Sequence, residues 1–229
     1  MDKKYTFEDL KDIVKKLRGE GGCPWDREQT HQSIKPNLIE EGYELAEAID
    51  GGNPEKIADE SGDLLLQVVF HAQIGEENGE YSMEDVTDAI CKKLIHRHPH
   101  VFGDVKAENS DEVLKNWNAI KRGDRGQETV AQEMEGVSKY LPALMRTEKI
   151  QGKAEKNGYI FNEPQVAADN ISGMIKVLVG NTDAAAAEKY IGKMLFELVC
   201  VARTMGVDAE VALSKHLDAF IQEFSKYER

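Results

Sequence analysis

The sequence has few cysteines, and none of them forms a metal-binding pair. Cys23, Cys91 and Cys200 are far apart in the sequence and include no Cys-x-x-Cys motif. This pattern argues against a disulfide framework and a cysteine zinc site, and we expect a reduced, cytoplasmic protein. No apolar stretch reaches the ~18 residues that a membrane span needs, so we expect no membrane partner. The sequence also lacks a glycine-rich P-loop.

The sequence also has fewer basic than acidic residues. Lysine and arginine together number 29, against 42 aspartates and glutamates, and the formal net charge is −13. Such a charge opposes a bare polyanion, so no nucleic-acid partner is expected, whereas a phosphorylated small molecule can bind if metal ions accompany it. Aromatic residues make up only 7% of the chain. Because alanine, leucine, glutamate and lysine dominate instead, the composition favours an all-α fold.

Apolar residues recur with helical spacing along the chain and are interrupted by glycine and proline. This periodicity predicts helices at 7–17, 30–49, 56–77, 82–97, 109–121, 141–152, 164–179, 184–205 and 209–227. The run "LLLQVVFHAQI" is apolar nearly all round and is expected to be buried. The stretch "DGGNPE" at 50–55 predicts a tight turn, so the two helices beside it should form an antiparallel hairpin.

Acidic residues gather on both arms of this hairpin. Residues equidistant from the turn lie side by side, which places Glu44 opposite Glu60 and Glu41 opposite Asp63. Four carboxylates in partly dry surroundings cannot all stay ionised without a cation, although a solvated acidic face is the alternative interpretation. The oxygen-only ligand set favours Mg²⁺, with Mn²⁺ possible. Glu40 is predicted to be an outer ligand or the base that activates water.

At these residues the sequence resembles the MazG family of nucleoside triphosphate pyrophosphohydrolases, all-α enzymes related to dimeric dUTPases. The family pattern EExxE followed by ExxD is present as Glu40, Glu41, Glu44, Glu60 and Asp63. The segments "GCPWD", "GDLLLQVVFHAQ" and "RHPHVFGD" also resemble the family, and the similarity spans roughly 7–122. The resemblance implies Mg²⁺-dependent cleavage of a nucleoside triphosphate to monophosphate and pyrophosphate, by a homodimer.

The resemblance also implies a substrate-binding group, formed by Lys93, Arg97, Trp117 and Lys121. Lys93 and Arg97 are four residues apart on one helix, so both cations can address one phosphate, and we expect them to act in catalysis beside Glu40 and Glu41. Trp117 and Lys121 repeat this spacing, so that an indole can stack on a base while the ammonium meets a phosphate. The alternative is a core tryptophan beside solvated cations.

The C-terminal half resembles a degenerate copy of the first half. "SGDLLLQVV" at 61–69 is similar to "IGKMLFELV" at 191–199, and Asn181–Thr182 predicts a second hairpin turn. In this copy the four carboxylate positions hold Asn170, Gly173, Tyr190 and Lys193. We therefore predict two tandem helical-bundle repeats: a catalytic domain at 1–125, a linker and connecting helix at 126–150, and a structural repeat at 151–229.

Other possible metal-binding residues are supported by weaker sequence patterns. His96, His98 and His100 alternate, as zinc ligands in an extended segment would, but hydrogen bonds that hold a helix end explain them better. His71 is expected to be a satisfied core histidine. A di-iron bundle would need paired ExxH motifs, and only "EQTH" fits. The alternative to an enzyme is a non-catalytic nucleotide-sensing or interaction module that keeps the fold.

Overall fold

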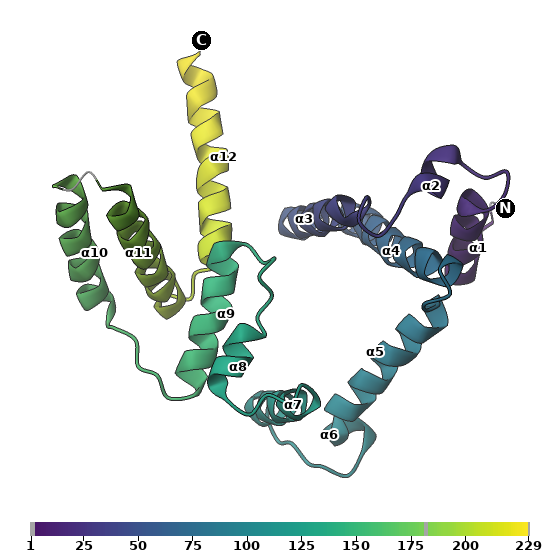
Figure 1. The fold of residues 1–229 in the computed structure, drawn as a ribbon, viewed down its shortest axis with the longest axis horizontal. Helices are drawn as coiled ribbons and strands as arrows, with labels where there is room; N and C mark the ends of the chain where they lie inside the picture. The colour runs from purple at the N-terminus through teal and green to yellow at the C-terminus, as the bar shows by residue number, and fades with distance from the viewer. Residues whose placement is uncertain (1–2, 181–182, 229) are drawn as a thin grey trace. The chain divides into compact units, whose positions relative to one another are not determined.

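A computed structural model describes residues 3–180 and 183–228 of the chain. Over these residues the regular elements are all α-helices, which confirms the predicted all-α fold. The chain divides into two compact units, Met1–Val113 and Leu114–Arg229 (Figure 1). In the described parts, no helix combines the length and apolar character needed to cross a membrane. The domain boundaries expected from the sequence remain a prediction.

The first unit is built around a helical hairpin. Its helices are α1 (Phe7–Arg18), α2 (Pro24–Glu28), α3 (Lys35–Gly51), α4 (Pro54–Glu77), α5 (Met83–Arg97) and α6 (Pro99–Phe102). Helices α3 and α4 pack along each other, while α1 and α5 both contact α4 (Figure 1). The short helix α2 lies in a stretch where the sequence predicted only a Gly/Pro break. Helix α4 therefore contacts the three other long helices of this unit, α1, α3 and α5.

The turn between α3 and α4 forms where the sequence predicts it. Gly52 has a φ of 67°, a left-handed conformation that glycine adopts without strain, and its N–H donates to the carbonyls of Ala48 and Ile49. Asn53 caps α4 by accepting a hydrogen bond from the N–H of Glu55, and Pro54 occupies the first helical position. Local chemistry at four consecutive residues thus sets the hairpin that carries the acidic side chains.

The core of the first unit lies between α1, the segment before α3, and α4. Its buried residues are Val14, Ile34, Val69, Phe70 and Ile74. The prediction that the apolar run of α4 is buried all round is wrong for part of it. Leu65 and Val68 are 39% and 36% exposed, whereas the polar Gln67 is buried. The neighbouring helices of this chain cover only part of the circumference of α4.

A buried arginine ties the segment around α2 to the hairpin. The Arg18 side chain is 4% exposed and forms an ion pair with Glu77, with Nη2 and Oε2 2.7 Å apart. Its guanidinium also donates to the carbonyls of Asp26 and Gln29 and lies over the Phe70 ring. No local sequence signal indicated this arrangement, because Arg18 and Glu77 belong to different helices.

The second unit contains a second hairpin. Its helices are α7 (Ser110–Asp124), which begins just before the unit boundary, α8 (Val130–Glu135), α9 (Ala143–Lys156), α10 (Pro164–Val179), α11 (Ala184–Thr204) and α12 (Ala209–Tyr227). Helices α10 and α11 pack along each other, as the repeat hypothesis predicts, and α9 contacts both α11 and α12. The predicted turn at Asn181–Thr182 lies outside the described residues. Helix α8 lies in the stretch that the sequence predicted to be a polar linker.

Candidate active site

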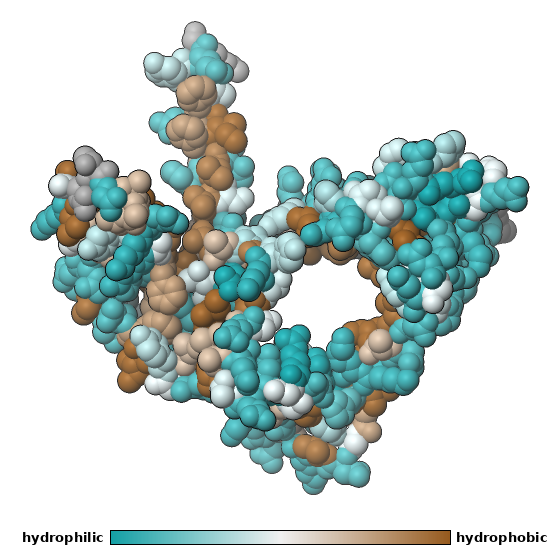
Figure 2. Space-filling view, in the orientation of Figure 1, coloured by the Kyte–Doolittle hydropathy of each residue, from teal (hydrophilic) through white to brown (hydrophobic). Residues whose placement is uncertain are grey.

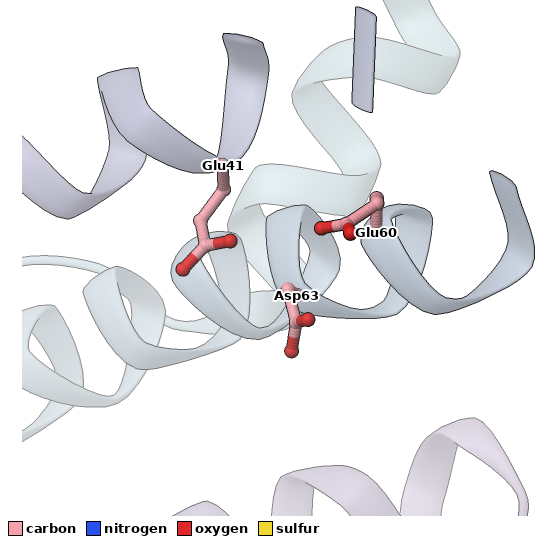
Figure 3. Close-up of side chains that lie close together, drawn as sticks. All are labelled: Glu41, Glu60 and Asp63. Carbon is pink, nitrogen blue, oxygen red and sulfur yellow. The ribbon is translucent and has the colours of Figure 1, made fainter. Parts of the chain in front are cut away.

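Three acidic side chains meet on the α3–α4 hairpin (Figure 3). Glu41 comes from α3, while Glu60 and Asp63 come from α4, three residues apart and therefore on one face. One carboxylate oxygen from each of the three lies within 4.8 Å of the other two. Glu41 and Glu60 are half-buried, and Asp63 is exposed. The structure thus brings together three of the four predicted metal ligands as one group, which we call the carboxylate group.

Negative charge accumulates at this group. Burial raises the pKa of Glu41, and the charges of Asp63 and Glu44 raise it further. Burial also raises the pKa of Glu60, with additional contributions from Glu44 and Asp63, while Lys56 opposes this shift. Raised carboxyl pKa values mean that the ionised forms are disfavoured here, and a bound cation would relieve this cost.

Glu44 and Glu40 flank the carboxylate group on α3. Glu44 is exposed and lies outside the group among the residues described, but its charge raises the pKa of both Glu41 and Glu60. Glu40 is also exposed and contributes to the raised pKa of Glu41. Both carboxylates are therefore close enough to raise the pKa of Glu41, although neither belongs to the carboxylate group.

The two predicted phosphate-binding cations of the first unit lie on α5. Lys93 is exposed, whereas Arg97, one turn further on, is 9% exposed. Helix α5 begins with a cap in which the Ser82 hydroxyl accepts a hydrogen bond from the N–H of Asp85. Helix α5 contacts α4, the helix that carries Glu60 and Asp63.

His98 supports the prediction that the alternating histidines hold a helix end. It follows α5, and its Nδ1 lies 2.7 Å from the carbonyl oxygen of Leu94. This contact satisfies a carbonyl in the last turn of the helix, where no backbone donor is available. The His100 ring lies 5.6 Å from that of His98, in a tilted arrangement. The local role is structural.

Trp117 and Lys121 come together on α7, in the second unit. The Lys121 Nζ lies 4.7 Å from the centroid of the Trp117 ring, a cation–π contact. Both residues are half-buried. The predicted i,i+4 arrangement is therefore present, with the indole and the ammonium on one face of the helix.

A histidine pair was not anticipated. The rings of His31 and His71 are stacked 5.0 Å apart, and their Nδ1 atoms are separated by 2.7 Å. At this distance one ring carries a hydrogen on Nδ1 and donates a hydrogen bond to the Nδ1 of the other ring. Burial lowers the pKa of His71, and His31 lowers it further. The predicted core histidine is thus half-buried and partnered by a residue from another segment.

In the described residues of the second hairpin, no equivalent acidic group is present. Asn170 and Gly173 lie on α10, and Tyr190 and Lys193 lie on α11. No group of three acidic, histidine or cysteine side chains suited to a metal occurs among the described residues of this unit. The ammonium of Lys193 would repel a cation.

Comparison with known proteins places these features in a family. The sequence model described as the MazG nucleotide pyrophosphohydrolase domain matches residues 29–102, which include all five acidic residues of the motif. A Thermotoga maritima protein named nucleoside triphosphate pyrophosphohydrolase/pyrophosphatase MazG is 42% identical over 222 residues, 97% of this chain and 85% of that protein. The Escherichia coli K12 nucleoside triphosphate pyrophosphohydrolase is 40% identical over 223 residues, 95% of this chain and 85% of that protein.

A third relative is more distant. The Mycobacterium tuberculosis nucleoside triphosphate pyrophosphohydrolase is 37% identical over 197 residues, which are 85% of this chain and 58% of that protein. Since the first two alignments cover nearly the whole chain, the similarity extends through both units and is not confined to the acidic motif. The chain therefore belongs to the MazG family of nucleotide pyrophosphohydrolases.

Proposed function

We propose that this chain is a Mg²⁺-dependent hydrolase that cleaves a nucleoside triphosphate to its monophosphate and pyrophosphate. The observation that carries the proposal is the carboxylate group, in which oxygens of Glu41, Glu60 and Asp63 from two helices lie within 4.8 Å of one another. Family membership supplies the substrate class, since the relatives named above are nucleoside triphosphate pyrophosphohydrolases.

The residues of the carboxylate group fit a hard divalent cation. Their donors are all oxygens, the ligands that Mg²⁺ and Mn²⁺ prefer, and no thiol or imidazole takes part. Glu44 is close enough to raise the pKa of Glu41 and Glu60, so it can serve as a fourth ligand. We propose Mg²⁺ as the physiological ion, with Mn²⁺ as a substitute.

The side chains of this chain have separate tasks in the proposed reaction. A bound metal ion supplies charge neutralisation for the phosphates and a more acidic water. Glu40 takes the proton from the attacking water, and Lys93 and Arg97 bind the phosphate oxygens whose charge grows as the P–O bond breaks. Trp117 stacks on the base and Lys121 meets a phosphate. Water attack releases the monophosphate and pyrophosphate as the only phosphorus products.

Product analysis tests the proposal directly. The purified chain with Mg²⁺ and a panel of nucleoside triphosphates should release one pyrophosphate per monophosphate, because the bond cleaved lies between the α- and β-phosphates. Phosphorus NMR of the reaction mixture distinguishes the products. Nucleoside diphosphate and orthophosphate as first products would contradict the assigned bond, and no turnover with any triphosphate would favour the nucleotide-sensing alternative.

We further propose that the chain forms a homodimer. Apolar side chains of the hairpin helices are exposed in the single chain: Ile39 by 51%, Tyr43 by 54%, Leu65 by 39% and Val68 by 36%. Figure 2 also shows brown, apolar side chains exposed along α12. Exposed apolar patches of this kind mark association surfaces, and helical units commonly pair to complete a bundle.

The expected mass in solution is that of two chains of 25.6 kDa. Light scattering coupled to size exclusion measures it at micromolar concentration. Replacing Val68 by aspartate should shift the mass toward that of one chain, because the charge would be buried in the interface. A single-chain mass for the unaltered protein would refute the dimer.

A further inference from the structure

The histidine pair lies at the open end of the α3–α4 hairpin, the end away from the turn. His31 belongs to the segment just before α3, and His71 lies on α4. Their Nδ1 atoms are 2.7 Å apart. Burial lowers the pKa of His71, so this ring is neutral at pH 7 and can share a hydrogen bond with its partner. Because a hydrogen bond is directional, it fixes how the two rings face each other.

The turn that carries His31 continues directly into α3. The N–H of Thr30 donates to the Ser33 hydroxyl at 2.9 Å, and the N–H of Ser33 donates to the Thr30 hydroxyl at 3.2 Å. The N–H of Ile34 donates to the carbonyl of Thr30, and the N–H of Leu38 donates to the carbonyl of Ile34, both at 3.2 Å. These bonds link the turn to the first residues of α3, so the position of the His31 ring determines where α3 begins.

A third aromatic ring contacts the histidine pair. The Tyr81 ring is stacked on that of His31, with centroids 6.1 Å apart, and its hydroxyl donates to the carbonyl of His71 at 3.2 Å. Tyr81 packs directly on Gly75 of α4, where a Cβ would lie 2.7 Å from the ring, closer than Cβ atoms approach. The segments before α3 and before α5 therefore both meet α4 at the histidine pair.

The carboxylate group lies between the histidine pair and the hairpin turn. His71 follows Asp63 by eight residues on one helix, a rise of about 12 Å. Burial and the charge of Asp63 raise the pKa of Glu41, and this charge repulsion pushes α3 away from α4 while no cation is bound. The turn opposes the repulsion at one end of the hairpin. The buried Ile34 and the histidine pair oppose it at the other end.

We propose that His31 and His71 are positioning residues for the metal site, because their hydrogen bond keeps Glu41 on α3 beside Glu60 and Asp63 on α4. Both imidazoles lie outside the carboxylate group of the described chain, so they act on the metal through the helices. Without the hydrogen bond, a cation must first draw α3 back toward α4 and therefore binds more weakly. This inference rests on the proposed function, since it assumes that the carboxylate group binds a divalent cation.

His31→Phe tests the proposal, since phenylalanine keeps a ring that can stack on His71 and Tyr81 but has no ring nitrogen. The dissociation constant for Mn²⁺ without nucleotide, measured by electron paramagnetic resonance, should rise about 10-fold. His31→Asn should bind Mn²⁺ within about three-fold of the unaltered protein, because its amide takes the place of Nδ1 and can bond to His71.

The matched control is His98→Phe, which removes another imidazole of the same unit. The Nδ1 of His98 contacts the carbonyl of Leu94 at the end of α5, away from the α3–α4 hairpin. Its dissociation constant for Mn²⁺ should equal that of the unaltered protein. His71→Leu removes the same hydrogen bond as His31→Phe from the other side. It should weaken Mn²⁺ binding to a similar extent, and combining the two changes should add little.

The dependence of turnover on Mg²⁺ gives a second readout that a loss of stability alone would not change. In His31→Phe the Mg²⁺ concentration for half-maximal pyrophosphate release should rise about 10-fold. At saturating Mg²⁺, kcat should return to within about two-fold of normal, because the metal-bound site holds α3 in place. A kcat that stays low at saturating Mg²⁺ would contradict a role in metal positioning.

The outcomes separate this inference from the proposed function. If His31→Phe and His71→Leu bind Mn²⁺ as tightly as His98→Phe, the positioning role is refuted, even where the melting temperature falls. A loss in His31→Asn as large as that in His31→Phe refutes the role of the hydrogen bond. Mn²⁺ binding that Glu41→Gln leaves unchanged refutes the metal site of the proposed function instead. If the unaltered protein releases no pyrophosphate, the proposed activity is refuted, while the Mn²⁺ titrations still decide the positioning role.

Discussion

Glu41→Gln should lower turnover at least about 100-fold while the protein remains folded. The substitution keeps the shape of the side chain and removes one charged oxygen from the carboxylate group, whose members lie within 4.8 Å of one another. A metal ion held by fewer charges neutralises the triphosphate less effectively. Steady-state pyrophosphate release at saturating Mg²⁺ and substrate measures the effect.

The control is Glu47→Gln, which removes an exposed carboxylate from the same helix, outside the carboxylate group of the described chain. It should leave turnover within about two-fold of the unaltered protein. Turnover near normal in Glu41→Gln would refute the site assignment. Substantial Mg²⁺-dependent release in that variant, abolished by mutating Asp169 or Glu188, would show that the second hairpin is catalytic.

Glu41→Gln should melt at a higher temperature than the unaltered protein in metal-free buffer at pH 7. Burial and the charges of Asp63 and Glu44 raise the pKa of Glu41 in the folded protein. A raised carboxyl pKa means that the folded state binds the proton more tightly than the unfolded state. The folded protein therefore loses stability as the pH rises through the pKa that Glu41 has in the folded state. Glutamine stays neutral and avoids this loss. A lower melting temperature than that of Glu47→Gln would contradict the charge crowding.

Removal of divalent metal should abolish activity and leave the helices intact. After dialysis against EDTA, pyrophosphate release should fall by more than about 100-fold, because the carboxylates and the triphosphate repel each other unless a cation lies between them. Added Mg²⁺ or Mn²⁺ should restore turnover, whereas Ca²⁺, which is larger and accepts irregular coordination, should restore much less. Circular dichroism should be unchanged throughout.

Mg²⁺ should also raise the melting temperature of the folded protein. A cation that binds the folded chain alone raises the melting temperature by mass action, so Mg²⁺ should stabilise the unaltered protein and stabilise Glu41→Gln less. Thermal scans with and without Mg²⁺ give this comparison independently of turnover. Full activity after thorough chelation would overturn the metal assignment, as would equal stabilisation of both proteins.

Features that depend on residues close together in the chain could be predicted from the sequence. Gly52 and Asn53 form the hairpin turn because one permits a left-handed backbone and the other caps the helix that follows. The helical period places Glu60 and Asp63 on one face, and the turn places Glu41 beside them. The acidic motif and the i,i+4 pair of Trp117 and Lys121 were therefore predictable.

Which faces of the helices are covered, and which distant residues meet, depends on how the helices pack and could not be predicted from the sequence. Leu65 and Val68 are exposed and Gln67 is buried, because the burial of an apolar helix depends on where its neighbours pack. The pairing of Arg18 with Glu77 joins residues of different helices. Likewise, His31 meets His71 only after the segment before α3 packs against α4. Helical periodicity fixes directions around one helix axis, but it holds no information on the rotation and spacing between axes.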